Sequence, residues 1–175
     1  MVLNGHVLEK VRTHSRELIK GKEYTLEGEI LYLSESFFKQ LYEETHGEIG
    51  LTVTLILTFS GGADWYHHLI YTDKPVLKEA AGKVGEAVQI PTIFNGNHLE
   101  SLIVKDSNDE SVANNKNLEY LQHSLEFKPG EDSIYLLSDF TSQLKDGDYT
   151  IHVTFFSGMR VFYHLHVENG EIKGK

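Results

Sequence analysis

The sequence predicts a mainly β protein: an antiparallel β-sandwich with one or two short helices near the N-terminus. Apolar and polar residues alternate along several short stretches, and turn residues separate those stretches. The composition is 40% hydrophobic and 24% charged, which is ordinary for a globular protein. Many short strands of this kind are typical of sandwiches and barrels, and the choice between the two stays open at this point.

The two expected helices lie in the first 50 residues. Apolar residues of 6–19 follow a helical spacing, so residues 1–20 are predicted to form a helical N-terminal extension. Ser34 can cap a second helix over residues 35–44, which should stop near Gly47. Between the two helices, residues 22–33 alternate as a strand does.

The strands follow in order. Residues 51–59 give the strongest alternation, and 65–72 is the expected hairpin partner across the turn "SGGAD". Shorter strands are predicted near 86–94 and 99–106, a further strand in 123–132 runs into a Pro-Gly turn followed by 133–140, and the final hairpin joins 148–156 to 160–168. The polar run 106–117 is expected to be a mobile, solvated acidic loop. No internal repeat is apparent, and one domain over residues 1–175 is the expectation from the length.

Composition excludes several kinds of function. The net charge of −10 disfavours nucleic acid and anionic membranes, because both partners need a basic surface. The chain has no cysteine, which excludes disulfides, thiolate nucleophiles and cysteine–zinc sites. No nucleotide, hydrolase or metallopeptidase motif occurs, so the prediction leans against an enzyme. The first 20 residues lack the apolar core of a signal peptide, so the protein is expected to be cytoplasmic, or exported with its signal trimmed away.

Residues 120–169 have a layout that resembles a known family. A strand ends in Pro-Gly-Glu, a second strand and a bridging segment follow, and Asp-Gly-Asp-Tyr opens an alternating strand. This layout is similar to bacterial immunoglobulin-like β-sandwich domains, in particular to the intracellular proteinase inhibitors of bacilli. The resemblance implies an immunoglobulin-like sandwich that binds other proteins, and it implies that Tyr149 packs inward while its hydroxyl bonds backbone upstream.

The last hairpin raises the question of a metal site. Apolar residues occupy the odd positions of both strands, so packing them on one core pairs odd positions with odd positions. That register needs a turn with an odd number of residues, most simply three, with Gly158 in the left-handed conformation. It places three imidazoles together on the opposite face: His152, His164 and His166.

Three imidazoles at cross-strand spacing could ligate zinc, copper or nickel. The ligands of a tetrahedral site must converge on one point, whereas side chains on a flat sheet face diverge. We therefore expect a solvated or interface face rich in histidine, with no cofactor, and keep zinc binding as the alternative.

A second candidate site lies on the predicted strand 65–72. Its aromatic and histidine residues suit a protein interface or a carbohydrate platform, since exposed rings of this kind bury a large area on binding. The residues are Trp65, Tyr66, His67 and His68. The competing interpretation places them in the core.

These observations lead to three hypotheses for the function. The favoured one is a non-enzymatic immunoglobulin-like module that engages a protein partner, such as a protease inhibitor or an accessory domain. The second is a small-molecule or carbohydrate-binding β-barrel of lipocalin type, which would differ from a sandwich by an interior cavity. The third is a metal-binding protein that uses the three histidines of the final hairpin.

Overall fold

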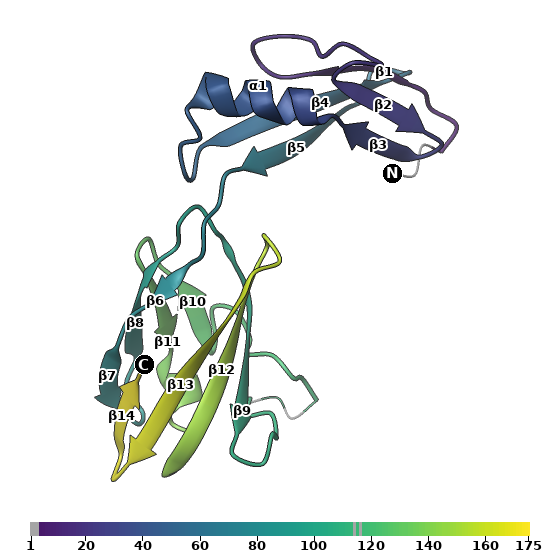
Figure 1. The fold of residues 1–175 in the computed structure, drawn as a ribbon. Helices are drawn as coiled ribbons and strands as arrows, with labels where there is room; N and C mark the ends of the chain where they lie inside the picture. Colours follow the sequence, from purple (N-terminus) through teal and green to yellow (C-terminus); the bar gives the residue numbers. More distant parts are fainter. Residues whose placement is uncertain (1–3, 114, 116) are drawn as a thin grey trace. The chain divides into compact units, whose positions relative to one another are not determined.

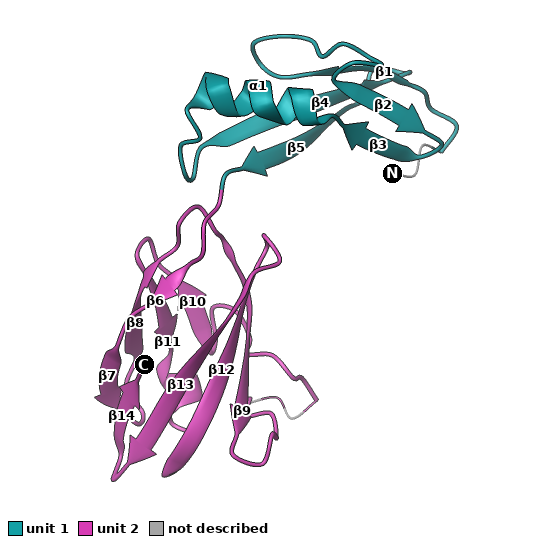
Figure 2. Cartoon of the chain, viewed as in Figure 1, with its two compact units in different colours: residues 1–71 teal, residues 72–175 magenta. Residues whose placement is uncertain are grey.

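The structure is a computed structural model that describes residues 4–113, 115 and 117–175. The chain divides into two compact units, unit 1 over Met1–Tyr71 and unit 2 over Thr72–Lys175 (Figure 2). Each unit has a separate hydrophobic core. The single domain expected from the length is therefore replaced by two small units, because the apolar residues before and after residue 71 gather around different centres.

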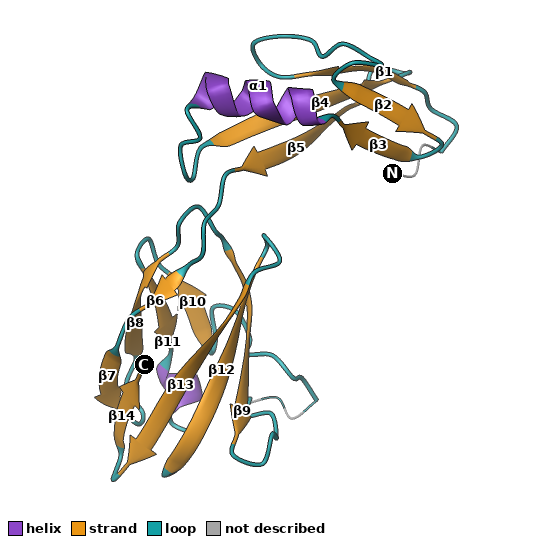
Figure 3. Ribbon diagram, viewed as in Figure 1, coloured by secondary structure: helices purple, strands orange, loops and turns teal. Residues whose placement is uncertain are grey.

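Unit 1 packs a helix and a β-hairpin against a three-stranded antiparallel sheet of order β1-β4-β5 (Figures 1 and 3). The elements are β1 (Leu8–Arg12), β2 (Tyr24–Glu27), β3 (Ile30–Leu33), α1 (Glu35–Thr45), β4 (Thr52–Phe59) and β5 (Asp64–Ile70). Phe37 and Leu41 of α1 are buried against Leu55 and Leu57 of β4. This burial fixes which face of the sheet the helix covers.

The helix predicted after Ser34 is confirmed. The Ser34 hydroxyl accepts the Phe37 N–H at 3.1 Å, which satisfies one of the free donors of the first turn. The helix ends at His46, which has the left-handed conformation, and the Gly47 N–H donates to the Tyr42 carbonyl at 3.1 Å.

The helical extension predicted over residues 1–20 is wrong for residues 4–20, where β1 stands in its place, and its first three residues lie outside the described ranges. A β-bulge between Leu8 and Lys10 shifts the register of β1 on β4, so that Leu8 and Val11 are both buried. The bulge therefore imitates the three-residue spacing of a helix. After β1 the Thr13 hydroxyl accepts the N–H of Arg16 at 3.2 Å, and the chain turns instead of coiling.

Unit 2 is a sandwich of two antiparallel sheets (Figure 1). One sheet has the order β10-β11-β8-β6 and the other the order β7-β14-β13-β12-β9. The elements are β6 (Val76–Leu77), β7 (Ala80–Lys83), β8 (Val88–Ile93), β9 (Leu99–Asp106), β10 (Phe127–Pro129), β11 (Ser133–Leu136), α2 (Ser138–Thr141), β12 (Gly147–Phe155), β13 (Arg160–Glu168) and β14 (Glu171–Gly174). Buried side chains of both sheets form one continuous core between them. The predicted antiparallel β-sandwich is confirmed, and a hollow barrel is not the architecture.

The final hairpin has the predicted register. Ile151 pairs with Tyr163 and Val153 with Val161, so the odd positions of β12 and β13 face the core together. The Phe155 N–H donates to the Met159 carbonyl at 3.0 Å and closes a turn of three residues. Gly158 in this turn has a φ of 83°, as the register requires.

The corner predicted at Tyr149 is also confirmed. Its ring is buried in the core of unit 2. Its hydroxyl donates to the Lys145 carbonyl at 2.9 Å and accepts the Lys145 N–H at 3.0 Å. The two bonds fasten the start of β12 to the segment that precedes it.

A repeat that is not apparent in the sequence links the two units. Residues 18–41 align with 121–144 without a gap, at an offset of 103, and seven of the 24 aligned residues are identical. In both copies the carboxylate of a buried glutamate accepts a backbone N–H four residues upstream at 2.8 Å: Glu23 that of Ile19, and Glu126 that of Gln122. Unit 2 therefore repeats the hairpin and helix start of unit 1.

The second half of the repeat has another offset. Residues 53–69 align with 149–165 at an offset of 96, and six of the 17 aligned residues are identical. Phe59 N–H bonds the Ala63 carbonyl at 2.9 Å, as Phe155 bonds Met159. Because the offset changes between the segments, no fixed period exists along the chain, and the prediction of no repeat is wrong. The change arises between the two aligned segments, where unit 1 has residues 42–52 and unit 2 has only residues 145–148.

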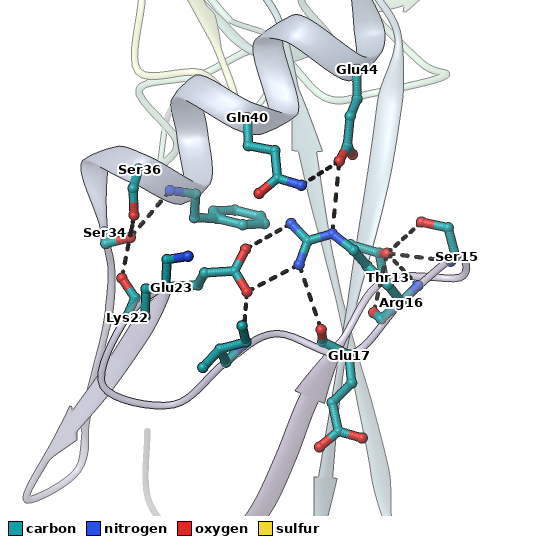
Figure 4. Close-up of polar contacts among 12 residues, drawn as sticks. Thr13, Ser15, Arg16, Glu17, Lys22, Glu23, Ser34, Ser36, Gln40 and Glu44 are labelled. Atoms are coloured by element: carbon teal, nitrogen blue, oxygen red, sulfur yellow. Dashed lines mark hydrogen bonds and ion pairs between the residues drawn. The ribbon is translucent and has the colours of Figure 1, made fainter.

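An ion pair between the partly exposed Arg16 and the buried Glu23 fastens the loop between β1 and β2 in unit 1 (Figure 4). Arg16 reaches the Glu23 carboxylate with two nitrogens, Nη2 at 2.7 Å from Oε1 and Nη1 at 3.0 Å from Oε2. Its Nε lies 3.7 Å from Glu44 on α1. The Arg16 guanidinium holds the pKa of the Glu23 carboxyl below its ordinary value, chiefly through the side-chain hydrogen bond.

Candidate functional site

The five-stranded sheet of unit 2 has an outer face, which is the face turned away from the four-stranded sheet. Residues of β12 and β13 alternate between buried and more exposed, so their even positions line this face. Strand β9 contributes the residues that pair with them. The face carries His152, His164 and His166, as the predicted register requires.

A row of apolar and aromatic side chains crosses the outer face from strand to strand. His152 pairs with Phe162 of β13 and with Ile103 of β9. Ile103 pairs in turn with Tyr120, which follows the loop 106–117. Because paired residues project to the same side, these four side chains form one line, the cross-strand row.

The aromatic members of the cross-strand row are open to solvent. Phe162 is 56% exposed and Tyr120 is 51% exposed, although both are large apolar side chains. The imidazole of His152 meets the Phe162 ring edge-on, with the ring centroids 4.8 Å apart. Aromatic rings left in water along one line are typical of a binding surface.

Polar side chains flank the cross-strand row on both sides. On one side Thr150 pairs with His164 and Lys105, and the Thr150 hydroxyl lies 3.2 Å from His164 Nδ1. On the other side Thr154 pairs with Arg160 and Ser101. The apolar line therefore runs between two lines of hydrogen-bonding groups.

A recess of about 910 Å³ lies beside the polar line that holds Thr150 and His164, and both residues line it. Asp148 and His166 line it as well, and His166 Nδ1 lies 2.7 Å from Asp148 Oδ1. Asp106, at the start of the loop 106–117, also lines the recess. Its carboxylate accepts the backbone N–H of Glu110 at 3.0 Å and of Asn108 at 2.8 Å, which holds the pKa of Asp106 below its ordinary value.

The three histidines proposed as a metal site have other neighbours. His152 packs on Phe162, His164 bonds Thr150, and His166 pairs with Asp148. Within residues 4–113, 115 and 117–175, no three side chains of the types His, Cys, Asp and Glu are grouped so that they could hold a metal ion. Each of the three histidines therefore has its own neighbour on the outer face.

The four residues predicted as a binding site on 65–72 lie on β5 of unit 1 and divide between its two sides. Trp65 points to the side that α1 covers, where its ring lies 5.0 Å from that of Phe59, and it is still 42% exposed. His67, two residues further along β5, points to the same side as Trp65. Tyr66 and His68 point to the opposite side, and His68 Nδ1 lies 3.1 Å from the Thr54 hydroxyl.

The sequence did not predict the cross-strand row, because the row depends on the pairing of Ile103 with Tyr120 across the loop 106–117. Tyr120 is 17 positions from Ile103 along the chain, and no local pattern joins the two. One signal was present: Tyr120 precedes the buried Leu121, so alternation alone directs its ring outward.

Comparisons with known proteins name the kind of module. The family model CBM46, described as a carbohydrate binding domain, matches residues 73–175, which is more than half of the chain. The chain belongs to this family of carbohydrate-binding domains. A second model, described as carbohydrate binding domain X2, matches residues 1–69, and the two matches fall on unit 2 and unit 1.

The relatives are parts of larger enzymes. The chain is 26% identical to endoglucanase B of Paenibacillus lautus over 174 residues, covering 98% of this chain and 30% of that protein. The tri-modular endo-β-1,4-glucanase Cel5B of Bacillus halodurans matches 97% of this chain with a TM-score of 0.88 and 24% identity, over 32% of its own length. The isolated CBM46 of the same enzyme covers 58% of this chain with a TM-score of 0.54 and 23% identity, over 97% of its own length. The chain thus spans about a third of the enzymes it matches.

The family assignment corrects several predictions. Both models describe carbohydrate-binding domains, so the protein partner, the protease-inhibitor role and the resemblance to immunoglobulin-like proteinase inhibitors are wrong. The layout of residues 120–169 marks a sandwich and its Tyr149 corner, and such a scaffold does not specify the ligand. The carbohydrate-binding alternative is confirmed, on a sandwich and not on a barrel. No helix in the described ranges is long and apolar enough to cross a membrane.

Proposed function

We propose that unit 2 binds a β-linked glucan along the cross-strand row of its outer face. The observation that carries the proposal is the line of Tyr120, Ile103, His152 and Phe162 on an open sheet face. The carbohydrate-binding family and the glucanase names of the relatives support this class of ligand.

The chemistry of the row suits a flat sugar ring. A pyranose with equatorial hydroxyls has apolar C–H faces and a polar rim. Its faces can stack on Phe162 and Tyr120, and its rim can reach the hydroxyls and imidazoles of the flanking lines, such as Thr150 and His164. The row crosses three strand spacings of about 4.8 Å, roughly 14 Å, which suits several linked sugars better than one.

The role of such a face is to hold a polysaccharide and not to cleave it. The chain matches only about a third of the glucanases that resemble it, so we propose that it acts as a non-catalytic module beside a glucan-hydrolysing enzyme. Polymeric β-glucans are too large to enter cells, so we propose that the protein acts outside the cell that makes it.

The test is the affinity of the full chain for soluble β-glucans, measured by affinity electrophoresis. Replacing Phe162 by alanine removes the most exposed ring of the row, and we expect at least about tenfold weaker retention, equivalent to ~1.4 kcal/mol. The matched control is Phe156→Ala, because Phe156 is a still more exposed phenylalanine, at 73% against 56% for Phe162, and it lies in the β12–β13 turn, outside the row.

Equal retention of the wild type and F162A would contradict the proposed face. So would an equal loss in F162A and F156A, since the row would then have no special part in binding. Thermal unfolding of each variant establishes that the fold is retained.

A further inference from the structure

The repeat places a second outer face in unit 1 at positions equivalent to the first. This is the face of the β1-β4-β5 sheet turned away from α1. Thr54 and His68 stand where Thr150 and His164 stand in unit 2, at the same offset of 96. The hydroxyl-to-imidazole distances match, at 3.1 Å and 3.2 Å.

An aromatic ring also recurs at the equivalent position. Tyr66 of β5 corresponds to Phe162 of β13, and the two rings are 58% and 56% exposed. Tyr66 pairs with Ile56 as Phe162 pairs with His152, and Ile56 pairs with Arg12 as His152 pairs with Ile103. Both units therefore present an exposed aromatic side chain beside the same threonine–histidine pair.

The surroundings of Tyr66 carry more charge than the row of unit 2. Ile56 is only 2% exposed, so it adds little accessible apolar surface. Arg12 lies 3.3 Å from Asp64, and Asp64 also accepts the Thr58 hydroxyl at 2.6 Å. One ring thus stands between a threonine–histidine pair and an ion pair, both able to exchange hydrogen bonds with sugar hydroxyls.

We propose that the outer face of unit 1 is a second pyranose-binding site, with Tyr66 as the stacking ring and His68, Arg12 and Asp64 beside it. The ligand class rests on the function proposed for unit 2, because the equivalence of the two faces carries it over. With one exposed ring in place of two, this site holds a shorter stretch of sugar and binds it more weakly. The chain then carries two sugar-binding sites, one on each unit.

The experiment is an NMR titration of the full chain with cellotetraose, a soluble β-1,4-linked glucose tetramer. The imidazole signals of His68 and His164 report on the two faces and are assigned with His68→Gln and His164→Gln. We expect both signals to shift with ligand, His164 at the lower concentration. Tyr66→Ala should abolish the His68 shift while the His164 titration changes less than twofold, and Phe162→Ala should do the reverse.

The matched control is His67→Ala, because His67 precedes His68 and lies on the opposite side of β5. It should leave both titrations unchanged, and Tyr66→Phe should keep the His68 shift because it keeps the ring. If only His164 responds in the wild type, the second site is overturned and the function of unit 2 stands. If only His68 responds, the proposed function of unit 2 is overturned, and if neither responds, both proposals are.

Discussion

The outer faces of the β1-β4-β5 sheet and of the five-stranded sheet have the same strand pairing at equivalent positions. They differ in the side chains that lie on them. In unit 2 the line of Tyr120, Ile103, His152 and Phe162 has no charged residue at pH 7 with neutral histidine, and its two end rings are exposed. In unit 1 the equivalent line from Arg12 through Ile56 to Tyr66 begins with a cation, and its aliphatic member is buried. Backbone pairing therefore decides where side chains can gather, and residue type decides how much apolar surface a ligand meets.

The two units also differ in the contacts of the buried glutamate that each of them contains. Each unit fastens a loop with a buried glutamate, Glu23 or Glu126, whose carboxylate accepts a backbone N–H at 2.8 Å. In unit 1 Arg16 adds a two-nitrogen ion pair, whereas the equivalent position in unit 2 is Glu119. The same turn is thus stabilised with different partners in the two copies.

The largest expected effect comes from removing the carboxylate of unit 1. Glu23→Ala leaves Arg16 without its buried partner, and we expect unit 1 to lose about 3 kcal/mol of unfolding free energy. Trp65 is the chain's one tryptophan and lies in unit 1, so its fluorescence during urea unfolding reports on that unit. Glu43→Ala, an exposed change on α1, is the control and should cost less than about 0.5 kcal/mol. An unchanged Trp65 transition in E23A would show that the ion pair does not stabilise the unit.

A smaller effect should follow from acid. The pKa of Glu23 in the folded protein lies below its ordinary value, so its contribution is fully present above that ordinary value, about 4.3, and is lost as the pH falls through the folded pKa. The Trp65 transition of the wild type should therefore weaken below about pH 4, and that of Glu23→Gln should depend less on pH over this window. Parallel pH profiles for the two proteins would contradict the assignment.

The smallest effect tests the difference between the faces directly. Ile103→Arg gives the row of unit 2 the cation that Arg12 supplies in unit 1, and we expect about three- to tenfold weaker binding of soluble β-glucan, near 1 kcal/mol. Ile93→Arg places the same change at an exposed position on the other sheet and should leave binding unaltered. Equal affinities of I103R and the wild type in affinity electrophoresis would mean that the middle of the row does not contact the ligand.

Local patterns along the chain were enough to predict much of the fold. Alternation predicted the antiparallel sandwich, Ser34 predicted the cap of α1, and the odd-to-odd pairing of β12 and β13 predicted a three-residue turn and the face that holds His152, His164 and His166. Each of these depends on residues close together in the sequence, where side-chain period and turn chemistry act directly.

Other features depend on residues that meet across long stretches of chain. The division into two cores, the bulge that makes β1 look helical, the repeat with its changing offset, and the pairing of Tyr120 with Ile103 are all of this kind. A one-dimensional pattern records which side of a strand a residue takes and not which strand lies beside it. Partner choice is settled by packing of the whole unit, and the proposed binding face exists only once that packing has placed four separate segments edge to edge.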